Sequence, residues 1–190
     1  FTQPDLARTL KSIQKNGPKA FYRGDIADLI VSEMEKHNGL ITKADLAAYK
    51  PVIRNPVRGT YRNHDILSMP PPSSGGIHIV QILNILEGYD LQSLGHNSAA
   101  TLHRMAEAMK YAYADRSKYL GDPDFAPIPT AGLTSKTYAE QLRQKIALNH
   151  ATPSANINPG KPPGYESGET THYSVIDKHG NAVAVTYTIN

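Results

Sequence analysis

GETTHYSVIDKHGNAVAVTYTIN, at residues 168–190, is patterned differently from the rest of the chain. Apolar and polar residues alternate here with a period of two, which is typical of β-strands. Residues 171–176 and 181–189 therefore predict two strands, and residues 177–180 predict the turn that joins them. We expect a β-hairpin at the end of an otherwise mainly helical chain, which is an α+β fold.

The length of the turn determines which residues of the two strands face each other. If residues 178–180 form a three-residue loop, with Gly180 in the left-handed conformation, Thr170 lies opposite Thr188. Asn190 then shares their face, because side chains alternate along a strand. A two-residue loop would shift the register by one residue and turn Thr188 away.

These three residues have the chemistry of an N-terminal nucleophile site. Cleavage of the Glu169–Thr170 bond would give Thr170 a free α-amine, with an ordinary pKa of about 7.7–8.0, as the base for its own hydroxyl. Thr188 would orient that hydroxyl, and Asn190 would donate to a carboxylate or an oxyanion. Threonine is also common in strands, so the three residues alone favour ordinary β-structure.

Upstream of the hairpin, apolar residues recur at helical spacing between punctuating glycines and prolines. The predicted helices cover residues 4–16, 25–37, 42–50, 77–87, 98–119 and 135–148. Residues 52–69 predict two short extended segments. On the helix of residues 98–119, the face expected to meet a core contains Leu102, Met105, Ala106, Met109, Ala112 and Tyr113.

The pattern divides the chain into three parts. Residues 1–148 are a helical region, residues 149–169 an exposed, flexible linker, and residues 170–190 the hairpin. The linker is predicted because its prolines, glycines and small polar residues leave too few apolar side chains for an element. The chain begins without methionine and ends inside a predicted strand, so we expect it to be a piece of a longer protein.

The composition excludes several classes of protein. Apolar residues make up 39% of the chain, which favours a globular protein. The net charge is only +3, and the positive and negative residues are interleaved along the chain, which argues against nucleic-acid binding. No apolar run is long enough for a membrane span. The absence of cysteine excludes disulfides and thiolate chemistry. The eight histidines lack metal-binding spacing, so neither a metal nor a cofactor is predicted.

Two shorter motifs have alternative interpretations. The loop of residues 73–76, Ser-Ser-Gly-Gly, predicts either a structural bend or an anion site at the start of the helix after it. It lacks the Gly-Lys-Ser/Thr ending of a phosphate-binding loop. Asp115 and Arg116 predict an internal ion pair or a helix cap.

Longer segments resemble a known family. Residues 168–175 and 177–190 closely resemble the processing site and first strands of bacterial γ-glutamyltranspeptidases, and residues 69–78 and 111–123 resemble their large subunit. The resemblance covers essentially the whole chain. It implies an N-terminal nucleophile hydrolase fold, an αββα sandwich of two sheets between helical layers. Residues 1–169 would then belong to the large subunit, and residue 170 would begin the small subunit.

The resemblance also implies a reaction. The precursor would cut itself at Glu169–Thr170, and Thr170 would attack the γ-glutamyl carbonyl of glutathione or a similar donor. The acyl group would pass to water, an amino acid or a dipeptide. Thr188 matches the threonine that hydrogen bonds the nucleophile, and Asn190 matches an asparagine that contacts the donor.

The same resemblance implies what lies outside these residues. The family's donor-binding arginine lies upstream, and its acidic, serine and oxyanion-hole glycine residues lie downstream. The remaining segments of the same precursor are therefore the expected partners, the chain alone is expected to be inactive, and the family implies a periplasmic or secreted location. Two alternatives remain: a cephalosporin acylase or capsule transpeptidase of the same superfamily, and a non-catalytic helical interaction module.

Overall fold

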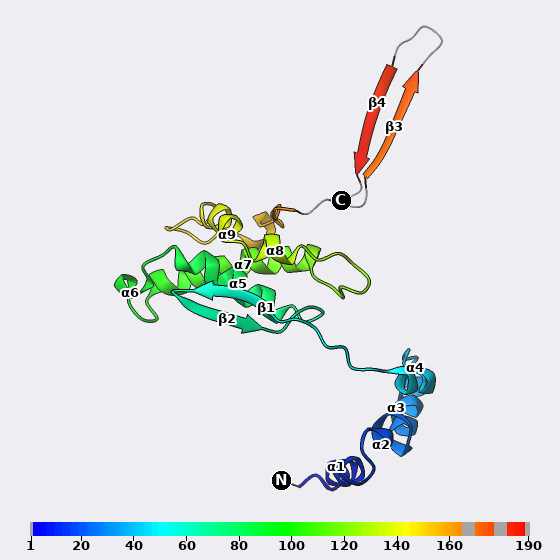
Figure 1. Ribbon diagram of the computed structural model, residues 1–190. Coiled ribbons are helices and arrows are strands. Elements are labelled where there is room, and N and C mark those ends of the chain that lie inside the picture. The colour runs from blue at the N-terminus through cyan, green and yellow to red at the C-terminus, as the bar shows by residue number, and fades with distance from the viewer. Residues whose placement is uncertain (1, 165–169, 177–181, 189–190) are drawn as a thin grey trace. The chain divides into compact units, whose positions relative to one another are not determined.

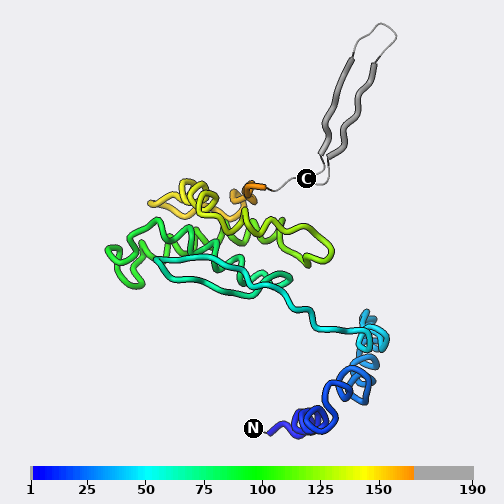
Figure 2. The backbone as a smooth tube through the Cα atoms, viewed as in Figure 1, coloured from blue at the N-terminus to red at the C-terminus, as the bar shows by residue number. Residues whose placement is uncertain are grey.

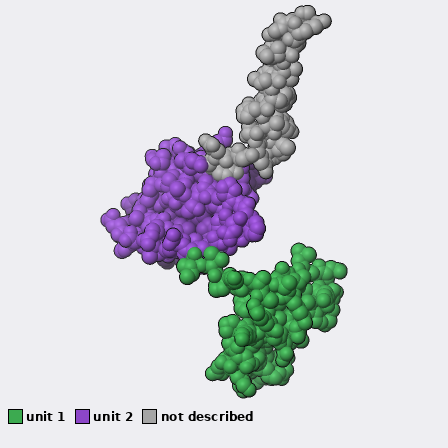
Figure 3. All heavy atoms as spheres, turned by 45° about the vertical axis from the view of Figure 1, so that its right-hand side comes forward, with its two compact units in different colours: residues 1–53 green, residues 54–190 purple. Residues whose placement is uncertain are grey.

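The computed structural model describes residues 2–164, 170–176 and 182–188, and helices dominate among them (Figure 1). The chain divides into two compact units, Phe1–Ile53 and Arg54–Asn190 (Figure 3). In the described ranges, the strands form two antiparallel pairs, both in the second unit. No helix of these ranges is long and apolar enough to cross a membrane.

The first unit is built from short helices. Its described residues form α1 (Pro4–Asn16), α2 (Pro18–Tyr22), α3 (Asp25–Lys36) and α4 (Lys43–Ala48). Helices α1, α3 and α4 confirm three predicted helices. Helix α2 has no counterpart in the prediction, because five residues are too few to show apolar periodicity. Gly17, with a φ of 65°, ends α1, and Pro18 begins α2 immediately.

Helix α4 begins with a capping box formed by Thr42 and Asp45. The backbone N–H of Asp45 donates to Thr42 Oγ1 at 3.2 Å, and the backbone N–H of Thr42 donates to Asp45 Oδ2 at 2.8 Å. Such a cap contributes about 1 kcal/mol to the stability of a helix. The rings of Tyr22 and Tyr49 stack with centroids 5.2 Å apart, which ties α2 to the end of α4.

The second unit begins with a hairpin and continues with helices. Strands β1 (Val57–Tyr61) and β2 (His64–Ser68) are the two extended segments predicted within residues 52–69. Arg62 and Asn63 between them both have positive φ, as a tight two-residue hairpin turn requires. The helices that follow are α5 (Gly75–Glu87), α6 (Leu91–Leu94), α7 (Ala99–Tyr119), α8 (Thr130–Leu133) and α9 (Lys136–Arg143), with a 3-10 turn, η1, at Ser154–Asn156.

Helix α5 is the centre of this unit, because α7, α9 and β1 all pack against it. Ile77 and Ile85 of α5 are completely buried, together with Ala108 of α7 and Leu142 of α9. Burial of one such large aliphatic side chain contributes about 1.5–3 kcal/mol. A side chain at Gly76 would collide with the Met69 carbonyl, so the glycine lets the backbone approach the start of α5. This contact favours the structural interpretation of the loop at residues 73–76.

The predicted core face of α7 is wrong. Leu102, Met105, Ala106, Met109 and Tyr113 are exposed, and of the predicted set only Ala112 is buried. The face that packs on α5 and α9 instead contains Thr101, Glu107, Ala108, Tyr111, Ala112, Asp115 and Tyr119. The apolar pattern pointed to the other side of the helix because two carboxylates lie on the buried face, where each accepts hydrogen bonds.

Strands β3 (Thr170–Ile176) and β4 (Ala182–Thr188) form the predicted second hairpin. They are antiparallel, and Thr170 pairs with Thr188 at one end of the ladder, while Ile176 pairs with Ala182 at the other. This register confirms the predicted pairing of Thr170 with Thr188 and excludes the one-residue shift. The turn itself, at residues 177–181, lies outside the described residues.

Candidate active site

The β3–β4 hairpin brings two of the four predicted site residues together. Thr170 is the first residue of β3 and Thr188 the last of β4, and they are direct backbone partners. Glu169, before the predicted cleavage point, and Asn190, the predicted donor contact, lie outside the described residues. The roles of all four residues in processing and catalysis therefore remain predictions.

The chain that leads to this hairpin is attached to the helical body over part of the predicted linker. Gly160 and Pro162 are buried, and Ile157 packs against the core. Figure 2 traces the backbone of this segment in yellow to orange, up to residue 164. A side chain at Gly132 of α8 would collide with the Pro163 carbonyl. The expected exposure of the linker is therefore wrong for these residues, because backbone groups and prolines fill the contact in place of large apolar side chains. The division of the chain at residues 148 and 169 stays a prediction.

Asp115 of α7 connects four parts of the second unit. Its carboxylate is 1% exposed and accepts hydrogen bonds from Gln81 Nε2 at 2.6 Å, the Tyr138 hydroxyl at 2.8 Å and the Gly160 N–H at 2.7 Å. Burial raises the pKa of Tyr138 far above its usual value, and the negative charge of Asp115 raises it further. Arg116 instead donates from Nε to Ser74 Oγ at 3.1 Å, so the ion pair predicted between residues 115 and 116 is wrong.

Glu107 holds the same segment at an earlier point. Its Oε1 accepts from Lys110 Nζ at 2.7 Å and from the Thr152 N–H at 3.1 Å, and Lys110 also donates to the Thr152 carbonyl at 2.9 Å. Burial raises the pKa of Glu107, but the hydrogen bonds from Lys110 and Thr152 outweigh this and lower the pKa below its usual value. Residue 152 is thus fixed to α7 by a partly buried, charge-assisted network.

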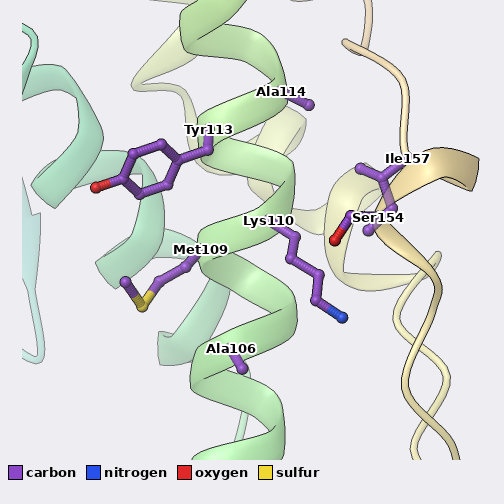
Figure 4. Close-up of a pocket in the computed structure, with 7 residues that line it drawn as sticks. All are labelled: Ala106, Met109, Lys110, Tyr113, Ala114, Ser154 and Ile157. Atoms are coloured by element: carbon purple, nitrogen blue, oxygen red, sulfur yellow. The ribbon is translucent and has the colours of Figure 1, made fainter.

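An open groove of about 520 Å³ runs between α7 and this segment (Figure 4). It is lined by Ala106, Met109, Lys110, Tyr113, Ala114, Ser154 and Ile157. Lys110 is its single charged residue, and the ammonium group is already bound by Glu107 and Thr152. The groove therefore lacks the converging polar groups of a substrate site.

In the described ranges, no cluster of three or more histidine, aspartate or glutamate residues has a metal-binding arrangement.

The burial of His78 on α5 leads us to predict that the stability of the protein depends on pH. Its side chain is buried, and burial lowers its pKa. The positive charge of Arg116 lowers the pKa further, and a hydrogen bond with the Ala112 backbone and the negative charge of Asp115 only partly offset this. The unfolded chain then binds a proton more readily than the folded one, so stability is lost as the pH falls below about 6.5. We expect the thermal midpoint of the full-length protein to drop between pH 7.5 and 5.5.

The histidine is tested by substitution. His78→Gln is expected to reduce the pH dependence of the midpoint, measured by circular dichroism, whereas His64→Gln on exposed β2 is expected to preserve it. An unchanged pH profile in His78→Gln would show that other groups cause the loss.

The fold is shared with solved structures. The chain superposes on the γ-glutamyltranspeptidase of Helicobacter pylori with a TM-score of 0.77 and 48% identity, covering 88% of this chain and 48% of that one. This similarity confirms the predicted α+β class, an N-terminal nucleophile hydrolase fold of which these residues form a mainly helical part.

Sequence comparisons narrow this class to one family. The gamma-glutamyltranspeptidase family model matches residues 1–190, so the chain belongs to the γ-glutamyltranspeptidase family. It is 60% identical to the glutathione hydrolase proenzyme of Escherichia coli K12, over 100% of this chain and 33% of that protein. It is 45% identical to the acylase ACY 1 proenzyme of Pseudomonas sp. SE83, with the same coverage of both chains. The chain thus spans about a third of the length of these relatives.

Proposed function

We propose that the full-length protein is a γ-glutamyltransferase and glutathione hydrolase that matures by cutting itself at Glu169–Thr170. The observation that carries the proposal is the match of the whole chain to one family, with relatives named as proenzymes. Membership of this family argues against the non-catalytic interaction module. The other segments of the same precursor complete the site, and a periplasmic or secreted location is part of the proposal.

The proposed processing step uses the Thr170 hydroxyl. The hydroxyl oxygen attacks the carbonyl carbon of Glu169, the peptide C–N bond breaks, and the nitrogen takes up a proton to become the α-amine of Thr170. Water then hydrolyses the ester between the two residues and releases the carboxylate of Glu169. Each cut thus consumes one water and creates the amine that later serves as base.

In the proposed turnover, the α-amine of Thr170 takes the proton of its own hydroxyl, and the oxygen attacks the γ-glutamyl carbonyl of the donor. The leaving amine departs with a proton, and the γ-glutamyl ester passes to water, an amino acid or a dipeptide. Thr188 orients the nucleophile, and Asn190 binds the donor. The pairing of Thr170 with Thr188 supports this assignment, because a register shifted by one residue would separate the two threonines.

An acylase is the second candidate, because the acylase ACY 1 proenzyme is 45% identical to this chain. A capsule transpeptidase of the same superfamily would also retain the nucleophile. These candidates differ in the acyl group that the site accepts: a γ-glutamyl group carries an α-amine that a glutaryl group lacks.

Two anilides therefore separate the candidates. We expect the purified, processed enzyme to release the chromophore from a γ-glutamyl anilide at least about 100-fold faster than from a glutaryl anilide, because a site built for the amine leaves polar groups unpaired without it. The measurement is kcat/KM from the absorbance of the released aniline. Equal values would overturn γ-glutamyl specificity, and a preference for glutaryl would identify an acylase.

A further inference from the structure

Gly160 is held at both backbone groups by one face of helix α7. Its N–H donates to Asp115 Oδ1 at 2.7 Å, and its carbonyl oxygen accepts from the Tyr119 hydroxyl at 2.6 Å. Asp115 and Tyr119 are four residues apart, so they are neighbours on the same face of the helix. These three residues, Asp115, Tyr119 and Gly160, are called the Gly160 clamp below.

We propose that the Gly160 clamp positions the segment that leads to Glu169–Thr170 and thereby sets the rate at which the precursor cuts itself. The inference rests on the proposed function, because it concerns the same cleavage. Asp115 and Tyr119 act through the backbone of the segment and are positioning residues. Both lie more than fifty positions before Thr170 in the sequence, and no chemical step is assigned to them.

The two side chains of the clamp are buried in the core. Asp115 is 1% exposed and Tyr119 is 5% exposed, and a bond to a buried carboxylate is stronger than one between neutral groups in water. A side chain at residue 160 would collide with the hydroxyl of Tyr138. Glycine is therefore the residue that lets the backbone reach both of its partners on α7.

The position of the clamp along the chain links it to the rate of cleavage, because it limits the length of free chain before Thr170. Gly160 lies ten positions before Thr170, and the hydrogen-bonded attachment before it, at Thr152, lies eighteen positions before Thr170. Pro162 is buried and the Pro163 carbonyl packs against Gly132, so the clamp and this packing together hold the end of the described segment to the helical body. Loss of the clamp loosens this attachment, and for a flexible tether full release back to Thr152 lowers the effective concentration of its end by about fourfold. Misplacement of the bond relative to the groups that polarise it lowers the rate further.

Two tyrosines of the same network provide a matched test. Tyr119→Phe removes the hydroxyl that holds the Gly160 carbonyl, and Tyr138→Phe removes a hydroxyl that donates to Asp115 Oδ2. Both variants lose one buried phenol oxygen, and only the first releases a backbone bond of the segment. The full-length precursor is made by cell-free translation, and the uncut fraction is followed by gel electrophoresis at a temperature well below the thermal midpoints.

We expect Tyr119→Phe to slow the first-order cleavage by about three- to tenfold, and Tyr138→Phe to change it less than twofold. Once cut, the Tyr119→Phe enzyme is expected to have the wild-type kcat and KM. Cleavage of Tyr119→Phe at the wild-type rate would overturn the inference. Equal slowing of both variants would also overturn it, because loss of stability alone would then explain the effect.

The Thr170→Ala precursor separates this inference from the proposed function. If the wild type stays uncut like Thr170→Ala, self-cleavage fails and the clamp has nothing to position. If the wild type is cut and Tyr119→Phe is cut equally fast, the proposed function stands and only the role of the clamp is lost.

Discussion

Replacement of Thr170 with alanine is expected to leave the full-length precursor in one piece and to lower γ-glutamyl transfer by at least about 10⁴-fold, as loss of a nucleophile does in other acyl-transfer enzymes. The proposed reason is that one hydroxyl performs both reactions. Without it, no ester forms at Glu169, no α-amine is released, and no oxygen remains to attack the donor. Intact-mass measurement of the purified protein tests the cut, and release of the anilide chromophore tests the transfer.

Thr170→Ser is the matched control, because serine keeps the hydroxyl and loses only a methyl group. This variant is expected to be cut, more slowly than the wild type, and to retain measurable transfer. Scission before residue 170 in Thr170→Ala would contradict self-cleavage by this hydroxyl. Cleavage of both variants at the wild-type rate would point to a separate protease.

Position 188 has a matched control within β4. Thr188 pairs with Thr170, whereas Thr186 pairs with His172, two residues further from the end of the ladder. Thr188→Ala is expected to lower the kcat of the cut enzyme by about 10²-fold, a usual cost of losing one orienting hydrogen bond. Thr186→Ala is expected to stay within a few-fold of the wild type. Equal losses in both variants would show that the hairpin, and not residue 188, is what the substitutions disturb.

The register of the β3–β4 hairpin is predictable from sequence because it depends on local rules. A loop of three residues, together with the alternation of the strands, leaves a single pairing for Thr170. The capping box of Thr42 and Asp45 is predictable for the same reason, since both partners lie within one helical turn. The pairing of Thr170 with Thr188 follows from these rules, whereas the roles of the two residues in the candidate site remain predictions.

The face of α7 is not predictable in this way. Leu102, Met105 and Met109 look like core residues, but they are 40–49% exposed, whereas Glu107 and Asp115 are buried. A carboxylate enters a core only where donors meet it, and all the donors to Glu107 and Asp115 except Lys110 come from residues 23 to 45 positions away in the sequence. Apolar periodicity contains no information about such partners.

The attachment of the predicted linker to the helical body is not predictable from the sequence, for a related reason. Gly160 is buried through its backbone groups, so its burial leaves no apolar signal in the sequence. A partial signal does exist, because Asp115 and Tyr119 are four residues apart on one helix and a carboxylate beside a phenol suits a peptide group. That pair marks a binding face on the helix, but it does not identify the residue bound.

Replacement of Asp115 with alanine is expected to destabilise the uncut precursor by about 3–5 kcal/mol, which places it among the most damaging single substitutions. The change removes one acceptor and leaves three buried donors, on Gln81, Tyr138 and Gly160, without a partner. Each stranded donor costs about 1–3 kcal/mol, and partial relaxation of the side chains reduces their sum. Thermal and urea unfolding in a Thr170→Ala background measure this without interference from cleavage.

Two further variants show whether the donors are the cause. Asp115→Asn keeps one acceptor oxygen for the Gly160 N–H, so it is expected to lose roughly half as much stability as Asp115→Ala. Asp65→Ala, on exposed β2, is expected to cost less than about 0.5 kcal/mol, as surface substitutions usually do. A loss below about 1 kcal/mol in Asp115→Ala would contradict the role of Asp115 in connecting these elements, because leaving three buried donors without an acceptor costs more than that. Since α5, α7, α9 and residue 160 all meet at this one carboxylate, its removal is expected to loosen them together, in a single transition.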